Sequence, residues 1–254
     1  MAYTPEDMYD QMLNIPGATD LTWLFNQRGI VQGYQREALS DYGILHITDS
    51  SSLAIFDEPK TSKDFGLFKN NYCLMQGRYV IPVYGISGKL LTFVGWYPDQ
   101  RKYLVMRSKY FGKNTDWFNI DKAYQKSLYT DGIVFVVEGM FDAIMLDILG
   151  LPAIAAMGSH VNASKSVLLT MFKRAVVIPD ADKVGQSALK KWNIPIEHKL
   201  VTIPEKKVQL SDTITKTIKD PDDLVKYYPK DELKAMLLDV ANTSSIYKHI
   251  TLPL

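Results

Sequence analysis

Four acidic residues in the second half of the sequence are placed where they could bind one divalent cation together. Glu138 and Asp180 each directly follow an apolar run of strand length. Asp182 stands two residues after Asp180, which puts both carboxylates on the same side of an extended chain, and Asp142 lies four residues after Glu138. Carboxylates gathered in this way repel one another unless a cation neutralises them. Mg²⁺ is the hard ion that carboxylates most often hold beside substrate phosphates.

These acids also have a structural alternative. Acids at strand ends often cap the following helix, and Asp182 could do only that for a helix that begins at Gly185. The Asp-x-Asp pair taken alone favours this structural role. The balance changes when three segments are taken together, because each follows an expected strand and opens an expected helix. The segments are Glu138-Gly139-x-x-Asp142, Gly158-Ser159 and Asp180-x-Asp182-x-x-Gly185.

The elements expected around the acids alternate between strand and helix. Strands are expected at 133–137, 153–156, 175–179 and 199–203, and helices at 140–149, 162–173, 185–192 and, as two short helices around Pro229, 221–240. The strands are continuously apolar rather than alternating, which predicts a largely parallel sheet with helices on both faces. Ligands bind such sheets at the carboxyl ends of the strands, where the acids lie.

The first half of the chain has a different pattern. Residues 1–126 are expected to form a smaller α+β subdomain ahead of a catalytic domain at 127–254. Two short helices are expected between Leu21 and Leu45. The two β-rich runs in 78–97, connected through Gly88, predict a hairpin.

A segment from Trp96 to Phe118 interleaves cations with aromatic rings. It contains Arg101, Lys102, Arg107, Lys109 and Lys113, and Trp96, Tyr97, Tyr103, Tyr110, Phe111, Trp117 and Phe118. Cations beside stacking rings suit a single-stranded template and an incoming nucleotide. The alternative is the rim of a sheet, with the aromatic side chains inside and the lysines in solvent.

Composition limits the classes of protein to which the chain could belong. The formal net charge is +1, from 29 basic and 28 acidic residues, so any nucleic-acid contact must be local. Cys73 is the only cysteine and the four histidines are far apart in sequence, which excludes a zinc site and a disulfide framework. The most apolar stretch, 133–157, is broken by three acids and is not expected to span a membrane. An intracellular location fits.

The run VVEGMFDAIML, then GLPAIAAMGS, then VVIPDADKVGQSAL resembles the Toprim domain shared by DnaG-type primases, topoisomerases and OLD-type nucleases. The resemblance implies a Toprim fold. It also implies that Glu138, Asp180 and Asp182 are the metal-site acids, with Asp142 in support. Lys219 to Asp223 resembles the KDPD-type segment that closes the primase active site, which assigns Asp220 to the metal centre.

The part before this domain resembles bacterial DnaG-type primases rather than topoisomerases. LFNQRGI at 24–30 is similar to their YLxxRGI segment. RYVIPVY at 78–84, followed by GKLLTFVGWYP, is similar to their RxxFPI…GxxxGFxGR segment. Residues 102–113 are similar to their KYLNS…FxK segment. The resemblance covers about residues 20–240. It departs at Trp96, where the family usually has a basic residue, and at Arg107-Ser108, which replaces Asn-Ser. It assigns nucleotide and template binding to Arg78, Lys102, Arg107, Lys109, Lys113, Gly158 and Ser159.

The resemblance therefore implies a DNA primase core, a nucleotidyltransferase that makes short RNA primers from NTPs on single-stranded DNA. The cofactor would be Mg²⁺ or Mn²⁺, without zinc. A replicative helicase and a separate zinc-bearing or initiation factor would be partners. A bacteriophage origin, and thus the cytoplasm of a bacterial host, fits the degree of divergence. Two alternatives stay open: an OLD-like, metal-dependent Toprim nuclease, and a non-catalytic subunit that binds to the replisome.

Overall fold

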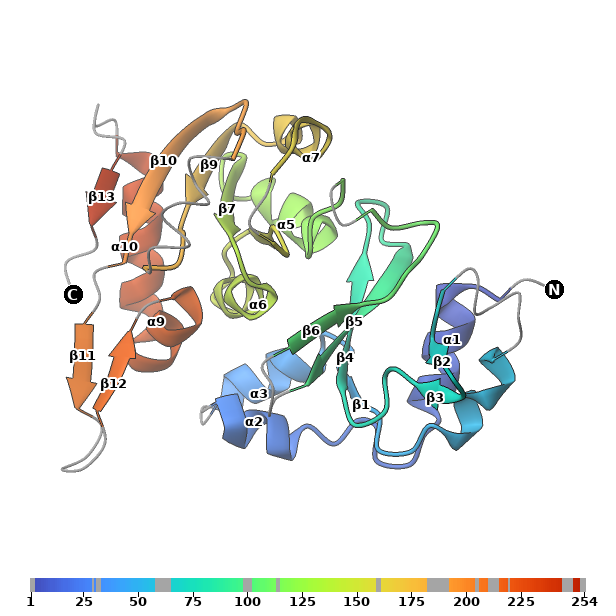
Figure 1. Cartoon of the computed structure of the whole chain (residues 1–254). Helices are drawn as coiled ribbons and strands as arrows, with labels where there is room; N and C mark the ends of the chain where they lie inside the picture. The colour runs from blue at the N-terminus through green and yellow to red at the C-terminus, as the bar shows by residue number, and fades with distance from the viewer. Residues whose placement is uncertain are drawn as a thin grey trace. The chain divides into compact units, whose positions relative to one another are not determined.

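The chain forms two compact units, 1–112 and 113–254, in the computed structural model (Figure 1). The structure describes residues 3–28, 30, 33–57, 65–97, 102–112, 115–158, 161–181, 192–203, 206–209, 215–218, 220–243 and 249–251. The unit boundary precedes the expected one at 126. The reason is that Trp117 and Ile120 pack into the core of the second unit.

The first unit is built on a four-stranded antiparallel sheet. Its strand order is β1 (Leu45–His46), β4 (Tyr79–Tyr84), β5 (Leu90–Tyr97) and β6 (Lys102–Val105). The expected hairpin is confirmed as β4 and β5, and Gly88 adopts the positive φ of 73° that its turn requires. Strand β6 was not expected, because its sequence is more polar than a typical strand.

Helices cover this sheet. They are α1 (Pro5–Leu13), α2 (Thr22–Arg28), α3 (Gly33–Ser40) and the 3₁₀ helix η1 (Ser51–Phe56), followed by a small hairpin of β2 (Phe68–Lys69) and β3 (Tyr72–Cys73). Helix α1 begins at a capping box between Thr4 and Asp7 and buries Met8 and Met12 in the core. The two short helices expected after Leu21 are confirmed as α2 and α3. Cys73 is buried.

The second unit has a five-stranded sheet, and all its strand pairs are parallel. Its order is β13 (His249–Thr251), β10 (Glu197–Thr202), β9 (Arg174–Val177), β7 (Ile133–Val137) and β8 (Ala153–Ala155). The continuously apolar runs thus form the parallel sheet that they predict. Strand β7 lies between β9 and β8 and is fully buried.

Helices pack on both faces of this sheet. Val134 and Val136 of β7 share a core with Trp117 and with Ile120 of α5 (Ile120–Ser127). Because successive residues of a strand point to opposite faces, Ile133, Phe135 and Val137 face the other side. Helix α6 (Met140–Ile148) contacts β7, β8 and α9 (Pro221–Tyr227). The expected α/β fold with helices on both sheet faces is confirmed.

Other predictions in this unit had mixed outcomes. The helix expected at 162–173 is instead α7 (Ala163–Val167) followed by the 3₁₀ helix η3 (Leu168–Met171). The helix expected at 185–192 falls outside the described residues, except for Trp192. The two helices around Pro229 are confirmed as α9 and α10 (Lys230–Asn242). A hairpin of β11 (Lys206–Gln209) and β12 (Thr215–Ile218) was not expected, and Figure 1 shows it apart from the parallel sheet.

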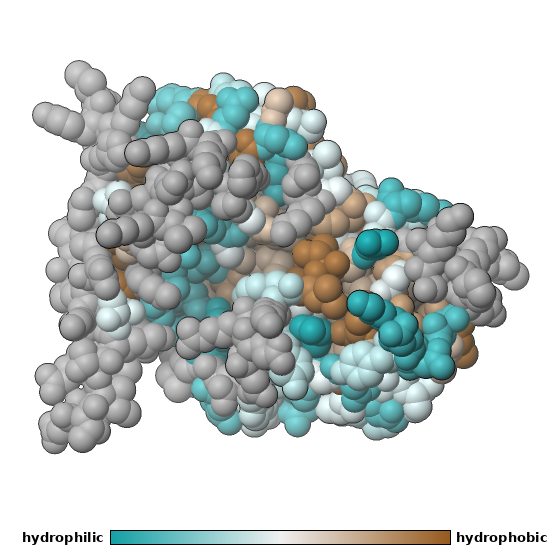
Figure 2. Space-filling view, viewed as in Figure 1, coloured by the Kyte–Doolittle hydropathy of each residue, from teal (hydrophilic) through white to brown (hydrophobic). Residues whose placement is uncertain are grey.

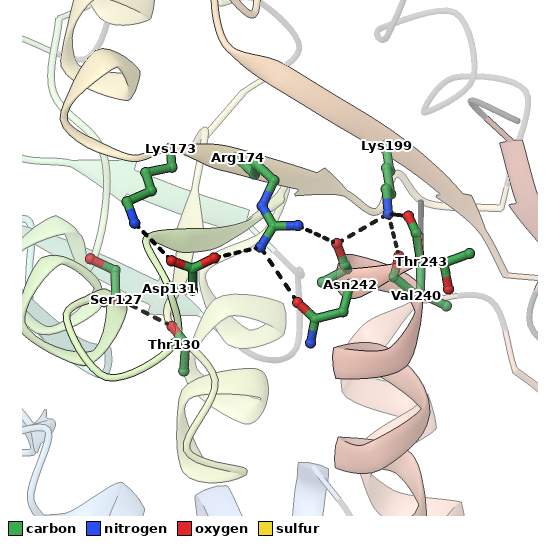
Figure 3. A network of polar contacts seen from close by, with 10 residues as sticks. Ser127, Thr130, Asp131, Lys173, Arg174, Lys199, Val240, Asn242 and Thr243 are labelled. Atoms are coloured by element: carbon green, nitrogen blue, oxygen red, sulfur yellow. Dashed lines mark hydrogen bonds and ion pairs between the residues drawn. The ribbon is translucent and has the colours of Figure 1, made fainter. Parts of the chain in front are cut away.

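Two cations on neighbouring strands hold the end of α10 against the sheet (Figure 3). Lys199 of β10 is buried, and its ammonium donates to the carbonyls of Val240, Ala241 and Thr243. Arg174 of β9 donates to the carbonyl of Ala241 at 3.2 Å and also pairs with Asp131 at 3.0 Å. A positive charge at a helix C-terminus complements both the unpaired carbonyls and the helix dipole.

Two further observations concern the prediction that the apolar stretch 133–157 does not span a membrane. Within the described part of the chain, no helix is both long enough and apolar enough to cross a bilayer. Hydrophilic residues are spread over the face seen in Figure 2, and apolar residues gather in separate groups there.

Candidate metal centre

The acids predicted to act together follow the ends of neighbouring strands. In the pairing of β7 with β9, Val136 stands opposite Val177, and the amide of Ile178 donates to the carbonyl of Val136 at 2.9 Å. Continuing this register by two residues sets Glu138 level with Pro179, the residue before Asp180. Neighbouring strands lie about 4.8 Å apart, so Glu138 and Asp180 leave the sheet side by side.

Helix α6 presents Asp142 to the same edge. Gly139 is the N-cap of α6, and Asp142 stands in its first turn. The Asp142 side chain folds back over Gly139, so closely that a Cβ built on Gly139 would lie 2.4 Å from Asp142 Oδ2. Asp142 is only 8% exposed. It is therefore an inward-facing acid at the N-terminus of a helix, where the helix dipole favours negative charge.

Helix α9 brings two further acids to Asp142. Asp220 is the N-cap of α9 and accepts from the amide of Asp223 at 2.8 Å, while Pro221 occupies the first helical position. The amide of Asp222 donates to Asp142 Oδ1 at 3.0 Å. The start of α9 is thus hydrogen-bonded to the start of α6.

Electrostatics show that these acids form one cluster. Burial, followed by the charges of Asp220, Asp222 and Asp180, raises the pKa of Asp142 well above its usual value. Burial, followed by the charges of Asp222 and Asp223, raises the pKa of Asp220 to about 6, and Asp180 acts in the same direction. Like charges that disfavour one another in this way are the environment that a bound cation relieves.

Asp222 was missed as a functional residue in the sequence, although the segment that contains it was singled out. Its charge acts on both Asp142 and Asp220, and it pairs with Lys226 at 2.8 Å, one helical turn further along. A usable signal was present: an acid followed by proline predicts an N-cap and first helical position. Asp222 then falls in the first turn of a helix beside the strand ends.

The donor set suits a hard divalent ion. Carboxylate oxygens are the preferred ligands of Mg²⁺ and Mn²⁺, and one oxygen each of Glu138 and Asp180 is buried. Among the described residues, no three acids, histidines or cysteines form a ready ligand set. Asp182, Ser159 and Lys219 lie outside the described residues. Gly158 is described and follows β8, and the amide of the preceding Met157 donates to the Glu138 carbonyl at 3.1 Å.

The basic and aromatic segment divides between core and surface. Trp96, Trp117 and Phe118 are buried, so for them the role in stacking template bases is wrong and the packing alternative holds. Trp96 lies within β5, Trp117 packs into the core of the second unit, and Phe118 pairs with Ala155 beside β8. Tyr103 and Tyr110 are exposed, and the Lys109 ammonium lies 5.0 Å from the Tyr110 ring centre.

The cations assigned to nucleotide or template binding lie mainly in the first unit. Arg107 and Lys109 are exposed. Arg78 is half-buried, donates from Nε to the Leu74 carbonyl at 2.8 Å and lies 5.4 Å from the Tyr97 ring centre. Lys102 is in β6, but its side chain, like the whole of Lys113, lies outside what the structure describes.

Trp96, where the resemblance departs from the family pattern, is part of an aromatic row. Residues opposite one another in neighbouring strands share a face, and His46, Tyr79, Trp96 and Tyr103 are successive partners across the sheet. The guanidinium of Arg28 lies 5.3 Å from the Trp96 ring centre. A cation is therefore supplied at this position by α2 rather than by β5 itself.

Comparison with protein families agrees with the geometry of the second unit. Residues 135–225, which include Glu138, Asp142, Asp180 and Asp220, match the family described as Toprim-like. This part of the chain is thus similar to Toprim-like domains. A search of curated proteins found no match.

Solved structures extend the likeness to both units. The DnaG catalytic core matches with a TM-score of 0.69 and 21% identity over 93% of this chain and 82% of that chain. The E. coli primase catalytic core matches with a TM-score of 0.67 and 22% identity over 89% of this chain and 75% of that chain. A DnaG primase catalytic domain bound to ssDNA matches with a TM-score of 0.66 and 20% identity over 92% of this chain and 80% of that chain. The two units thus have the fold of DnaG catalytic cores.

Proposed function

We propose that the chain is a primase core that synthesises RNA primers from NTPs on single-stranded DNA. The observation that carries this proposal is the group of mutually repelling acids Asp142, Asp180, Asp220 and Asp222, of which Asp142 and Asp222 are buried, within a chain that has the DnaG core fold. The ssDNA-bound DnaG domain among its structural neighbours supports single-stranded DNA as the template.

The chain's acids would hold one or two Mg²⁺ ions. Glu138, Asp180 and Asp182 would be the main ligands, and Asp142 and Asp220 would complete the negative field around them. When bound, the metal supplies Lewis-acid activation of the primer 3′-hydroxyl and charge neutralisation on the leaving pyrophosphate. The 3′-hydroxyl gives up its proton to solvent, its oxygen bonds to the α-phosphorus, and the bond from that phosphorus to the pyrophosphate oxygen breaks.

The reaction also requires that the triphosphate and the template be positioned. The exposed cations Arg107 and Lys109 would attract the triphosphate and the template backbone, and Tyr103 offers an exposed ring on which a base can stack. Lys102 and Lys113 would add to this positive surface. Because phosphoryl transfer depends on orientation and electrostatic stabilisation, no nucleophilic side chain is required.

The decisive experiment is primer synthesis by the purified protein with Mg²⁺, a single-stranded template and labelled NTPs. Asp180→Asn and Glu138→Gln should each lower the rate by roughly 10²-fold or more, because each removes a ligand of the Mg²⁺ that would stabilise the anionic transition state. Asp131→Asn is the matched control, since Asp131 is an exposed acid of the same unit whose partners are Lys173 and Arg174.

The same assay separates the alternatives. A nuclease would shorten the template and incorporate no nucleotide, and a non-catalytic subunit would bind the template without changing it. Extension at the wild-type rate by both acid variants would contradict the metal assignment. Adding a helicase or a zinc-bearing initiation factor tests whether initiation needs a partner.

A further inference from the structure

A buried ion pair joins Asp222 of the acid cluster to Lys226. The Lys226 ammonium is 2.8 Å from Asp222 Oδ2, and the two side chains are only 5% and 7% exposed. Lys226 stands one helical turn after Asp222 on α9. Removing two charges from water is costly, and a buried pair often contributes little net stability. The pair therefore calls for an explanation other than stability alone.

Asp222 connects this pair to the candidate metal centre. Its amide donates to Asp142 Oδ1 at 3.0 Å, while its carboxylate accepts from Lys226 at 2.8 Å. Its negative charge acts on both Asp142 and Asp220. Lys226 is thus connected to Asp142 and Asp220 through Asp222. Helix α9 carries both the negative charge of Asp222 and the positive charge of Lys226 that compensates it.

We propose that Lys226 is a built-in counter-cation and a positioning residue of the metal centre. It fixes the Asp222 carboxylate, holds the first turn of α9 against Asp142, and reduces the negative charge that an arriving divalent ion meets. The apo protein then tolerates its acids, at the cost of weaker metal binding. This inference rests on the proposed metal-dependent function.

Thermal unfolding of the full chain over a range of Mg²⁺ concentrations tests the inference without relying on activity. Lys226→Met makes the cluster one charge more negative, so the variant should unfold at a lower temperature in EDTA. Mg²⁺ should then stabilise it at a half-effect concentration on the order of ten-fold below wild type. Lys226→Arg, which keeps the charge, should restore the wild-type concentration.

Two further variants test whether the effect passes through Asp222. Asp222→Asn leaves Lys226 in excess and should raise the half-effect concentration, again on the order of ten-fold. The double variant Asp222→Asn/Lys226→Met removes both charges and should return near the wild-type value. This comparison decides the question even if Lys226→Met alone does not accumulate as folded protein.

Lys126→Met provides a matched control. Lys126 pairs at 2.7 Å with Asp147, a buried acid in the last turn of α6, and Asp147 is not among the charges that act on Asp142 or Asp220. This variant should lose the same stability with and without Mg²⁺.

The outcomes separate the inference from the function on which it rests. If Lys226→Met, or the pair of Asp222 variants, shifts stability equally at every Mg²⁺ concentration, Lys226 is only structural and the inference is overturned. The same holds if the double variant fails to return toward wild type. A wild-type protein that Mg²⁺ does not stabilise at all would instead overturn the metal centre itself.

Discussion

At the scale of single residues, Gly139 sets the position of Asp142. A Cβ at Gly139 would force the Asp142 carboxylate to move, because that carboxylate occupies the space and accepts a hydrogen bond there from the Asp222 amide. We expect Gly139→Ala to displace Asp142 and lower primer synthesis by about 10- to 100-fold, since misplacement of about 1 Å at a reacting centre has this effect. The melting temperature should change little.

Gly33→Ala is the control for this variant. Gly33 begins α3, its φ is not in the left-handed region, and a Cβ there would meet nothing within 4 Å. Its activity should equal that of wild type. A fully active Gly139→Ala enzyme would show that the position of Asp142 does not matter for the reaction.

The pKa of Asp220 gives a pH prediction for the metal-free protein. Because its pKa is raised to about 6, the folded state binds a proton more tightly than the unfolded state does. This contribution to stability is fully present below the ordinary pKa near 3.8 and is lost as the pH rises through about 6. Unfolding in EDTA, measured by urea titration at several pH values, should show this loss. Asp220→Asn should reduce it.

The residue scale also shows what sequence could predict of the site. Glu138 and Asp180 were predicted because each follows an apolar strand, and their places in the chain are fixed by main-chain pairing. The contact of Asp222 with Asp142 joins residues 80 positions apart and depends on how α9 packs on α6. The burial of Trp96 likewise depends on packing, because Trp96 stands between Tyr79 and Tyr103 on the neighbouring strands.

At the scale of elements, Lys199 fastens α10 to the parallel sheet. It is 8% exposed and donates to three carbonyls at the end of that helix. Lys199→Met keeps the length of the side chain but leaves these acceptors without this donor, so we expect a loss of about 1–3 kcal/mol in the free energy of unfolding. Urea denaturation measures it.

Lys173→Met is the companion variant. Its pair with Asp131 is on the surface, where side chains of 70% and 66% exposure gain little from an ion pair. It should unfold at nearly the same urea concentration as wild type. Equal destabilisation by the two variants would contradict the role given to Lys199.

The elements also differ in how far sequence determined them. Strands β7, β8 and β9 were predicted because each apolar run is too short for a typical buried helix and is bounded by turn residues or polar residues. The helix expected at 162–173 changes to 3₁₀ form after Val167, where Lys165 and Ser166 are held by the distant carbonyls of Ala156 and Asn193. The β11–β12 hairpin is polar and carries no such pattern.

At the scale of the whole molecule, chemistry and recognition are assigned to different units. The acid cluster belongs to residues 113–254, whereas Arg78, Arg107 and Lys109 belong to residues 1–112. The near-zero net charge, +1, does not reveal this division, because basic and acidic residues are balanced within each unit as well, with 11 of each in residues 1–112 and 18 against 17 in residues 113–254. Composition alone therefore could not reveal a nucleic-acid enzyme.

Hydrogen exchange read by mass spectrometry tests this division. Mg²⁺ should protect the first turns of α6 and α9, because it neutralises the acids that hold those turns together, and should leave β4 and β5 unchanged. Single-stranded DNA added in EDTA should protect β6 and residues 103–110 instead, and added salt should weaken that protection because phosphate contacts release counterions. If Mg²⁺ protected only the first unit, or DNA only the second, the two roles would have been assigned to the wrong parts of the chain.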